Sequence, residues 1–423
     1  MPSLSRLPLC TTALAGVALV VAAACGSGSS NPASPGGDDG GSASSSGGSS
    51  SGAGSSSGSG SSSGTASSSG AADSGAGFHG GNPNGSCSTG VPAGGKPADT
   101  SHPTTVVGSG SPSSCTFAAL QAAVAKGGVI TFDCGGGPVT IGVTATLSLP
   151  TSTSTVIDGG NLVTLDGGDA AQILRFDSPG WQTNTNRVTL QHLALVHAKE
   201  TPTQAIPPAP APCSQGWDDG QGGAVYMRDG SLTVIDCVFD HDQAAPLGPD
   251  TGGGAIYVQG SKSGVLIVGS TFTNDAASNG GAVGVLWAEL DVYDSLFTGN
   301  VGTGHDANNN DPSKCSVMNN GQNEIGSGGN GGALYGDGNN FNVLLCGDDV
   351  ENDAAGMNAF GGGLFFTSDN MAGTLTIQDT TMEGNTGGHW TNVAGGSVTN
   401  AGTAIGVNAK SITITHSMLQ GVP

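Results

Sequence analysis

The pentapeptide GGAVY at residues 222–226 returns at irregular intervals along the second half of the chain, and its recurrence decides the fold. The further copies are GGAIY at 253–257, GGAV at 280–283, GGALY at 331–335, GGGLF at 361–365 and a degraded GTAI at 402–405. A glycine pair suits a tight corner with positive φ, and the apolar residues after it suit the start of a buried strand. Each copy therefore predicts a turn that leads into a strand.

An alternating strand follows each copy and ends in a bulky residue, with Asn or Asp often three positions further on. The bulky positions are Leu195, Phe239, Phe272, Phe297, Val350, Met382 and Leu419. Phe272 and Phe297 are only 25 residues apart, and a unit of that size cannot bury its apolar side alone. Stacked units share one core, so we expect a parallel β-solenoid in which the Asn and Asp residues form hydrogen-bonded ladders or left-handed turns.

A β-propeller is the competing architecture for a β-rich repeat. Its blades need four antiparallel strands over about 40 residues, joined by hairpins. We find no hairpin turn signals between consecutive strands, which favours the solenoid. Upstream, the segment Thr116–Lys126 places Phe117, Leu120 and Val124 at helical spacing after Ser113 and Ser114. This predicts a short helix that caps the open end of the solenoid.

The repeat resembles known sequences. Its Gly-Gly-Ala-apolar-aromatic step and Phe-x-x-Asn/Asp motif are similar to the repeats of chlamydial-type polymorphic outer membrane proteins and of the pectin-lyase-like superfamily. The resemblance covers about residues 115–423 and implies an all-β fold, a right-handed parallel β-helix with a short N-terminal capping helix. It leaves the activity open, because this architecture hosts adhesins, lyases, hydrolases and inert spikes.

The composition excludes other classes of protein. Glycine accounts for 76 of 423 residues, which is too many for a helical bundle, and the glycines fall in clusters rather than at every third position, as collagen requires. Ten Lys and Arg residues oppose 32 Asp and Glu residues, and the formal net charge is −22. Because the cations are scattered singly, we expect no nucleic-acid partner.

The N-terminal residues predict where in the cell the protein is located. Arg6 and an apolar run over residues 13–24 precede Cys25, and this run is too short to span a bilayer. The stretch VAAACG at 21–26 resembles a lipoprotein box, although the family prefers Leu where Ala22 stands. The resemblance implies a lipoprotein signal peptide over residues 1–24 and lipidation of Cys25. An ordinary signal peptide that leaves Cys25 free is the alternative.

A tether is expected after the anchor. Residues 25–77 are almost wholly Ser, Gly and Ala, which bury no apolar surface, so we expect this segment to be disordered, followed by an irregular lead-in over 78–114. Gly26 replaces the Asp that retains many lipoproteins at the inner membrane. The resemblance therefore implies a lipid-anchored, extracytoplasmic protein at a bacterial outer membrane or cell surface, and we expect a monomer.

The cysteines favour an oxidising compartment. Seven remain beyond Cys10 and Cys25, without the spacing of a metal site, so disulfides are their natural use. The expected pairs are Cys115–Cys134, Cys213–Cys237 and Cys315–Cys346, with Cys87 left over.

Candidate functional residues lie in insertions that share one phase of the repeat, at 199–221, 240–251, 301–328 and 384–401. The same phase means the same side of a solenoid, and loops on a rigid scaffold often carry binding. One hypothesis is a polysaccharide lyase, which needs a cation, a base and an acid. The candidate calcium ligands are Asp218, Asp219, Asp240 and Asp242, and the candidate catalytic residues are Lys199, Asp218, Asp219 and Lys314, with Arg228 as a further base.

The second hypothesis is a binding protein without catalysis. Trp217 and Trp390 could stack on sugar rings, and His241, His305 and His389 could bind a ligand or together a metal. The charge of −22 repels anionic polymers unless calcium bridges them. We therefore expect non-catalytic binding or adhesion to an extracellular carbohydrate or surface. The alternative is a calcium-dependent polysaccharide lyase or glycoside hydrolase, and we expect no obligatory cofactor other than this calcium.

Overall fold

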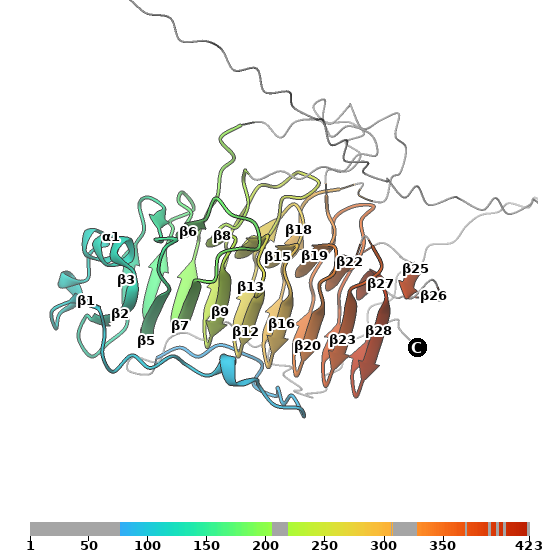
Figure 1. Ribbon diagram of the computed structural model, residues 1–423, viewed down its shortest axis with the longest axis horizontal. Helices are drawn as coiled ribbons and strands as arrows, with labels where there is room; N and C mark the ends of the chain where they lie inside the picture. Colours follow the sequence, from blue (N-terminus) through green and yellow to red (C-terminus); the bar gives the residue numbers. More distant parts are fainter. Residues whose placement is uncertain are drawn as a thin grey trace, which may run out of the picture. The chain divides into compact units, whose positions relative to one another are not determined.

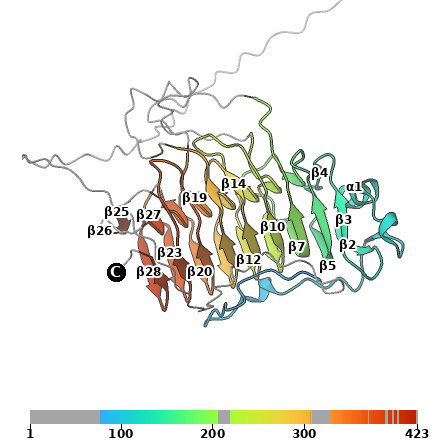
Figure 2. The same ribbon diagram turned by 180° about the vertical axis from the view of Figure 1, so that it is seen from behind.

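The computed structural model shows a parallel β-helix. It describes residues 77–204, 219–305, 307, 328–368, 370–387, 391–394, 397–400 and 403–420, all of which belong to one compact unit, Ser67–Pro423. The coils follow one another in chain order, from the blue-green end to the red end of Figure 1, and Figure 2 shows the same succession from behind. The expected all-β solenoid is confirmed.

Three rows of strands build the coils, each strand pairing in parallel with its counterpart in the next coil. The first row holds β2 (Gly128–Asp133), the first parts of β5 (Thr155–Asp166) and β7 (Arg187–Val196), β9 (Ser231–Ile235), β12 (Val265–Val268), β16 (Leu290–Tyr293), β20 (Val343–Cys346), β23 (Thr374–Gln378) and β28 (Ser411–Thr415). The second row holds β3 (Val139–Gly142), the last parts of β5 and β7, β10 (Val238–Asp240), β13 (Thr271–Thr273), β17 (Leu296–Thr298), β21 (Asp349–Glu351), β24 (Thr381–Glu383) and β29 (Met418–Leu419). The third row holds β4 (Leu147–Ser148), β6 (Leu174–Asp177), β8 (Val225–Arg228), β11 (Ile256–Gln259), β15 (Val283–Leu286), β19 (Leu334–Gly338), β22 (Leu364–Ser368) and β27 (Ile405–Ala409).

Short elements complete the described fold. β1 (Thr105–Gly108) pairs in parallel with β2, and β14 (Ala276–Ala277) pairs with β18 (Val301–Gly302). β25 (Thr391–Ala394) and β26 (Ser397–Asn400) form an antiparallel pair beside β27. Two short 3-10 helices, η1 (Ala93–Gly95) and η2 (Pro112–Ser114), precede the single described α-helix, α1 (Phe117–Lys126).

The register aligns the bulky residues of the repeat one above another. The aligned column runs through Leu195, Phe239, Phe272, Phe297, Val350, Met382 and Leu419. The rings of Phe239, Phe272 and Phe297 stack, with centroids 4.7 and 4.8 Å apart. The repeat that defined these positions in the sequence therefore marks the interior column that holds the second row together.

The expected capping helix is confirmed as α1. The Thr116 side chain accepts a hydrogen bond from the Ala119 backbone N–H, so Thr116 rather than the Ser113–Ser114 pair is the N-cap. Leu120 and Val124 are fully buried, and Phe117 packs against the core. The helix thus covers the apolar interior that the first coil leaves open.

The glycine pairs form the corners that lead into the third row. The first glycine of each pair has a φ between 54° and 73°, from Gly280 to Gly331. A Cβ on the second glycine, such as Gly254, would overlap the backbone of the neighbouring coil. The pair is therefore required both by the backbone conformation and by the close approach of successive coils.

Residues 77–104, which we call the strap, run along the corner between the first and second rows. The backbone of Gly80 donates to Asp236 at 2.7 Å, and Ser88 donates to Asp379 at 2.8 Å. The chain then returns, and Ala98 donates to Gln191 at 2.8 Å. Figure 1 shows the strap in blue beneath the coils. Fixed to the corner residues of many coils, it links segments that a plain solenoid would leave independent.

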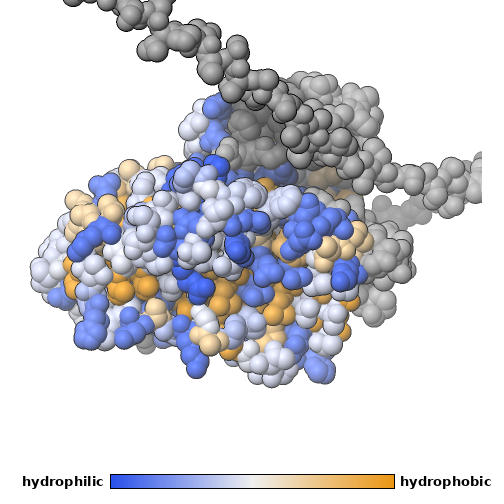
Figure 3. Space-filling view, in the orientation of Figure 1, coloured by the Kyte–Doolittle hydropathy of each residue, from blue (hydrophilic) through white to orange (hydrophobic). Residues whose placement is uncertain are grey.

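Apolar contacts add to the strap's hydrogen bonds. Val91 of the strap and Leu266, Val268 and Leu344 of the first row pack against one buried cluster, which consists of Cys87, Tyr293 and Cys346. Figure 3 shows hydrophobic residues over this region, broken up by polar ones. The strap covers part of the apolar surface that the outer face of the first row leaves exposed.

The disulfides correct part of the expected pairing. Cys115 pairs with Cys134, as predicted. Cys87, expected to be left over, pairs with Cys346, so the expected Cys315–Cys346 bond is wrong. The cause is the strap, which returns Cys87 to a coil that lies 259 residues later in the sequence, with a Cα–Cα distance of 5.1 Å.

Cys237 keeps a free, fully buried thiol, so the expected Cys213–Cys237 bond is also wrong. Cys237 stands at a corner position that other coils fill with Ser270, Ser295 and Thr380. Its thiol donates to the Ile235 carbonyl at 3.4 Å, as the hydroxyl of Ser270 donates to Val268. The thiol is therefore a member of a hydrogen-bonded ladder, and burial raises its pKa to about 12.

Candidate functional site

The insertions of the repeat meet on one face of the solenoid, as their shared phase predicts. In their described parts, the backbone N–H of Glu200 donates to the Gln243 carbonyl at 2.9 Å, and that of Ala245 donates to the Gly220 carbonyl at 2.8 Å. The Thr303 hydroxyl donates to the Pro246 carbonyl at 2.9 Å. Figure 1 shows the loops that leave the second row gathered above the coils. This face, which we call the loop face, carries the described candidates Lys199 and Asp219.

The predicted catalytic residues on the loop face have structural partners. Asp219 accepts hydrogen bonds from Thr203 and Gln204 at 2.8 to 3.1 Å, which closes the loop around it. Lys199 extends the sheet through a parallel bridge with Gln243. Trp217, Asp218, Lys314, His389 and Trp390 lie outside the described residues, as does Cys25. Lys199 and Asp219 are thus the catalytic candidates of the loop face that the structure describes.

Asp242, a predicted calcium ligand, is fully buried in a ladder of Asp and Asn residues. The ladder consists of Asp242, Asp275, Asn300, Asp353 and Asn385, each three positions after a bulky residue of the repeat. A side-chain oxygen of each member accepts the backbone N–H of the preceding coil, at 2.7 to 3.0 Å. Burial raises the pKa of Asp242 well above its usual value, with Asp275 adding to the effect. Its carboxyl is therefore a buried structural group of the ladder, away from the protein surface.

Two other predicted residues, Asp240 and His241, lie at a surface turn together with a third that the sequence analysis missed. His197 occupies the same turn one coil earlier, two positions after Leu195, just as His241 stands two positions after Phe239. The rings of His197 and His241 have centroids 5.9 Å apart. His305 belongs to the later insertion that begins at Val301. The repeat alignment contained the signal for His197, since both histidines share one phase.

The two predicted tryptophans lie outside the described residues, but two others meet on the surface. Trp181 is 42 % exposed, and its ring lies 6.4 Å from that of Trp287 at an interplanar angle of 65°. Trp181 belongs to the loop between β6 and β7, whereas Trp287 follows β15, several coils later. Periodicity could not find this pair, because the loop crosses from one coil to another.

A buried carboxylate fixes the loop of Trp181. Asp229 is fully buried and accepts hydrogen bonds from Thr183 and Asn184 at 2.9 to 3.0 Å. Gln182 then donates from its backbone to Gly260 at 2.7 Å and from its amide to the Trp287 carbonyl at 3.2 Å. The loop is thereby held across two later coils, and the position of the Trp181 ring is set by the scaffold.

Trp287 is held in an unusual backbone conformation. Its φ is 56°, in the left-handed region that bulky residues rarely adopt. The equivalent corner position holds Gly260 in the preceding coil and Gly338 in the next, and a Cβ on Gly260 would overlap the Trp181 ring. Glycines on either side make room for the two indoles. A strained bulky residue at a surface corner is the kind of outlier that points to function.

A cavity of about 230 Å³ opens on the loop face beside Lys199, Glu200 and Gln243. Burial raises the pKa of Glu200 to about 7, and nearby Arg175 opposes part of the rise while Asp219 adds to it. Arg175 itself lies over the Tyr226 ring, 4.2 Å from its centroid. A carboxyl that titrates near neutrality in a cleft is suited to donate and accept protons.

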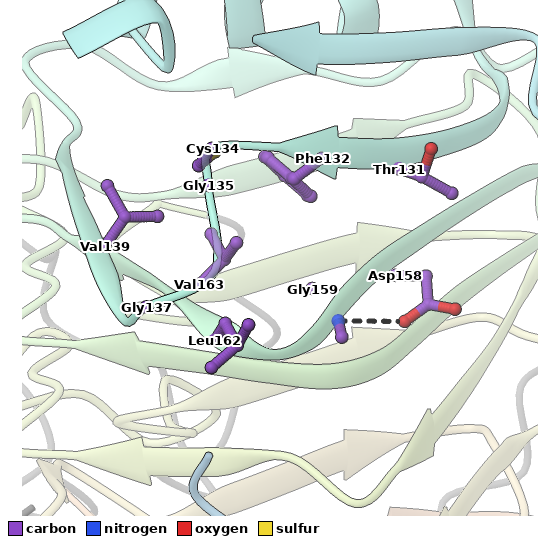
Figure 4. A pocket seen from close by; sticks show the side chains of 11 residues that line it. Thr131, Phe132, Cys134, Gly135, Gly137, Val139, Asp158, Gly159, Leu162 and Val163 are labelled. Atoms are coloured by element: carbon purple, nitrogen blue, oxygen red, sulfur yellow. Dashed lines mark hydrogen bonds between the residues drawn. The ribbon is translucent and has the colours of Figure 1, made fainter. Parts of the chain in front are cut away.

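A second cavity, of about 180 Å³, lies near the N-terminal coils and is shown in Figure 4. Phe132, Val139 and Leu162 supply its apolar wall, and Asp158 is the one carboxylate among its lining residues. Asp158 accepts from the Gly160 backbone at 3.0 Å and contacts His192 at 3.0 Å. Burial raises the pKa of Asp158, but these and other hydrogen bonds outweigh it and hold the pKa below its usual value. The hydrogen bonds of the Asp158 carboxylate therefore stabilise the turn at Gly159 and Gly160.

Within the described ranges, the structure contains no helix of the length and apolar character needed to cross a membrane. No family model matches the chain, and no curated protein or solved structure matches it. The chemistry of its surface is thus the basis on which a function can be proposed.

Proposed function

We propose that this chain is a lipid-anchored β-helix protein of the bacterial cell surface that binds extracellular carbohydrate without catalysis. The proposal includes membership of the pectin-lyase-like superfamily with chlamydial-type repeats, anchorage through Cys25 and a tether over residues 25–77. The observation that carries the binding function is the pair of the exposed Trp181 and the partly buried Trp287 on a corner of the scaffold.

The tryptophan pair suits a sugar ligand because an indole offers a flat apolar face for the C–H side of a sugar ring and an N–H for its hydroxyls. Exposed amides follow along the same corner, where the Asn370 amide donates to Asn340 at 2.9 Å. Both the aromatic rings and the amides are fixed before binding, so little conformational entropy is lost when a ligand docks.

The charge of the chain selects among carbohydrates. At a net charge of −22, polyuronides and other acidic polymers are repelled at long range. We therefore expect neutral glycans such as glucans, mannans and xylans to bind in preference to polygalacturonate.

The test is affinity electrophoresis and calorimetry of the full chain against neutral and acidic polysaccharides. Trp181→Ala should weaken binding of the preferred neutral glycan at least tenfold, because it removes one face of the pair. Met357→Ala is the matched control, since Met357 is 67 % exposed but lies on the loop face. An unchanged affinity in Trp181→Ala, or an equal loss in Met357→Ala, contradicts the proposal.

A second candidate function is hydrolysis or elimination on a polysaccharide, favoured by the pKa of about 7 for Glu200 beside a cavity. The full chain would be incubated with the same panel, with and without calcium, while released reducing ends and the ultraviolet absorbance of unsaturated sugars are followed. Product that appears with the wild type but not with Glu200→Gln would replace the binding hypothesis by a catalytic one. Product without calcium and without ultraviolet absorbance would identify hydrolysis.

A further inference from the structure

The turns that directly follow the second row of strands, which we call the second corner, hold a cluster of two histidines and one aspartate. The proposed carbohydrate site does not use this cluster. One ligand atom from each of His197, Asp240 and His241 lies within 4.8 Å of the others. The side chains of His197 and His241 are 44 % and 54 % exposed, and that of Asp240 is 34 % exposed. We infer that His197, His241 and Asp240 form a surface site for a divalent transition-metal ion, of which Zn²⁺ is the type.

The coil repeat brings the two histidines together. Val196 pairs with Asp240 in the register of β7 and β10, and the His197 backbone donates to the Asp240 carbonyl at 3.0 Å. Both histidines have a left-handed backbone, with φ of 48° and 58°. Their side chains therefore leave adjacent coils in the same direction. Side-chain rotation can place one nitrogen of each ring 2.0–2.1 Å from a shared ion, which is the length of a Zn–N bond.

Neighbouring groups orient the ligands as outer partners do in metal sites. The His197 Nδ1 lies 3.3 Å from an Asp166 oxygen, which favours a proton on Nδ1 and leaves Nε2 free to bind a metal. The Thr273 hydroxyl donates to Asp240 at 2.8 Å, and the Asn274 amide donates to it at 3.2 Å. Asp240 is thus held by the following coil while His197 is held by the preceding one.

The donor set selects the metal. Two imidazoles and one carboxylate suit Zn²⁺, Ni²⁺ or Cu²⁺, whereas Ca²⁺ takes six to eight oxygen ligands. Three protein ligands leave at least one position open to water or to an external ligand. At Asp240 we therefore expect a transition-metal ion instead of the calcium that the sequence suggested.

Other corners show that a single His–Asp pair is an ordinary turn device of this fold. His192 contacts Asp158 at 3.0 Å and His416 contacts Asp379 at 3.4 Å, each with a left-handed histidine. Only at the second corner do two described histidines occupy adjacent coils. At that corner the later coils carry Asn274, Gly299 and Asn352, so asparagine is tolerated there without histidine.

The test is calorimetric titration of the full chain, without a histidine tag, with the chlorides of Zn²⁺, Ni²⁺ and Ca²⁺. We expect one equivalent of Zn²⁺ to bind. His197→Asn and His241→Asn should each raise the Kd at least tenfold, because each removes a ligand while keeping a residue that the turn accepts. His416→Asn is the matched control and should leave the Kd unchanged. Equal Kd values in all four proteins, an equal loss in the control, or Ca²⁺ binding as tightly as Zn²⁺ overturns the site.

A chemical readout keeps the test independent of folding defects. Zn²⁺ should protect His197 and His241 from diethyl pyrocarbonate while His416 remains reactive, as peptide mass spectrometry would show. Modification of all three histidines at the same rate with and without Zn²⁺ contradicts the assignment. The wild-type protein is used, so no variant has to fold.

Discussion

At the scale of single residues, the buried Asp/Asn ladder shows two chemistries at one structural position. Asn300 and Asn385 donate from their amides to the carbonyls of Phe272 and Val350, at 3.2 and 2.8 Å. Asp353 stands between them in the ladder, and its Oδ2 has no hydrogen-bond partner. Burial raises the pKa of Asp353 well above its usual value. The protonated form of this carboxyl has an O–H to donate, as its neighbours have an N–H.

Replacing this carboxyl by an amide should stabilise the protein at neutral pH. Because the folded-state pKa is raised, the stability that Asp353 contributes is complete below the unfolded pKa of about 3.9 and is lost as pH rises through the folded-state value. We expect Asp353→Asn to increase the free energy of unfolding at pH 7 by about 1–3 kcal/mol and to change it little at pH 4. Urea unfolding at the two pH values measures this.

The reciprocal variant is the control for the ladder. Asn385→Asp should destabilise the protein at pH 7 and steepen the loss of stability between pH 4 and 7, since it adds a buried acid. A stability gain for Asp353→Asn that is as large at pH 4 as at pH 7 would show that the carboxyl is not the cause.

The sequence predicted these ladder positions but not the turn residues beside them. An Asn or Asp three positions after five of the seven bulky residues was recognisable, because its type recurs. The position before it changes from His197 and His241 to Asn274, Gly299 and Asn352. What these residues share is a left-handed backbone, a property that several residue types can satisfy.

At the scale of elements, the rows of strands were predictable and the strap was not. Strands such as β10 and β13 follow from a repeated local pattern that stacking alone explains. The strap has no periodicity and no core of its own, so its position depends on contacts such as that of Ser88 with Asp379, which lie 291 residues apart. The Trp181 loop escaped prediction for the same reason, because it is held by residues of other coils.

Removing the strap disulfide should cost more stability than removing the disulfide beside α1. The Cys87–Cys346 bond closes a loop of 259 residues and the Cys115–Cys134 bond one of 19. Chain entropy then gives losses of about 5.5 and about 3 kcal/mol for the two double Cys→Ala variants. Urea unfolding measures both.

Limited proteolysis distinguishes the strap from the rest of the element. Cleavage within residues 77–104 should accelerate in Cys87→Ala/Cys346→Ala and stay slow in Cys115→Ala/Cys134→Ala. The opposite order, in stability or in cleavage, would mean that hydrogen bonds alone hold the strap to its corner.

At the scale of the whole molecule, the fold could be predicted and the function could not. The glycine pairs and the bulky column are needed by every coil, so they recur and identify the solenoid. A binding residue is needed once and leaves no periodic trace, as with Trp181 and Trp287 of the proposed carbohydrate site. The candidate catalytic residues were chosen by loop phase, and phase places a residue on a face without bringing it near a partner.

The proposed anchorage makes a prediction for the entire chain. Cys25→Ala should abolish incorporation of radiolabelled fatty acid and move the protein from the membrane fraction to the soluble fraction. Cys10→Ala is the control, because Cys10 lies within the predicted signal peptide and should leave labelling unchanged. Equal labelling of both variants would remove the lipid anchor from the proposed function.

The strap also imposes an order on biosynthesis. Cys87 leaves the ribosome 259 residues ahead of Cys346, and the corners that receive the strap belong mostly to coils made after it. The part of the strap around Cys87 must therefore wait for the late coils before it can dock. The Cys87–Cys346 disulfide can form only after every coil between these two cysteines has been made. A truncated chain would therefore carry an unpaired Cys87 thiol that quality control could recognise.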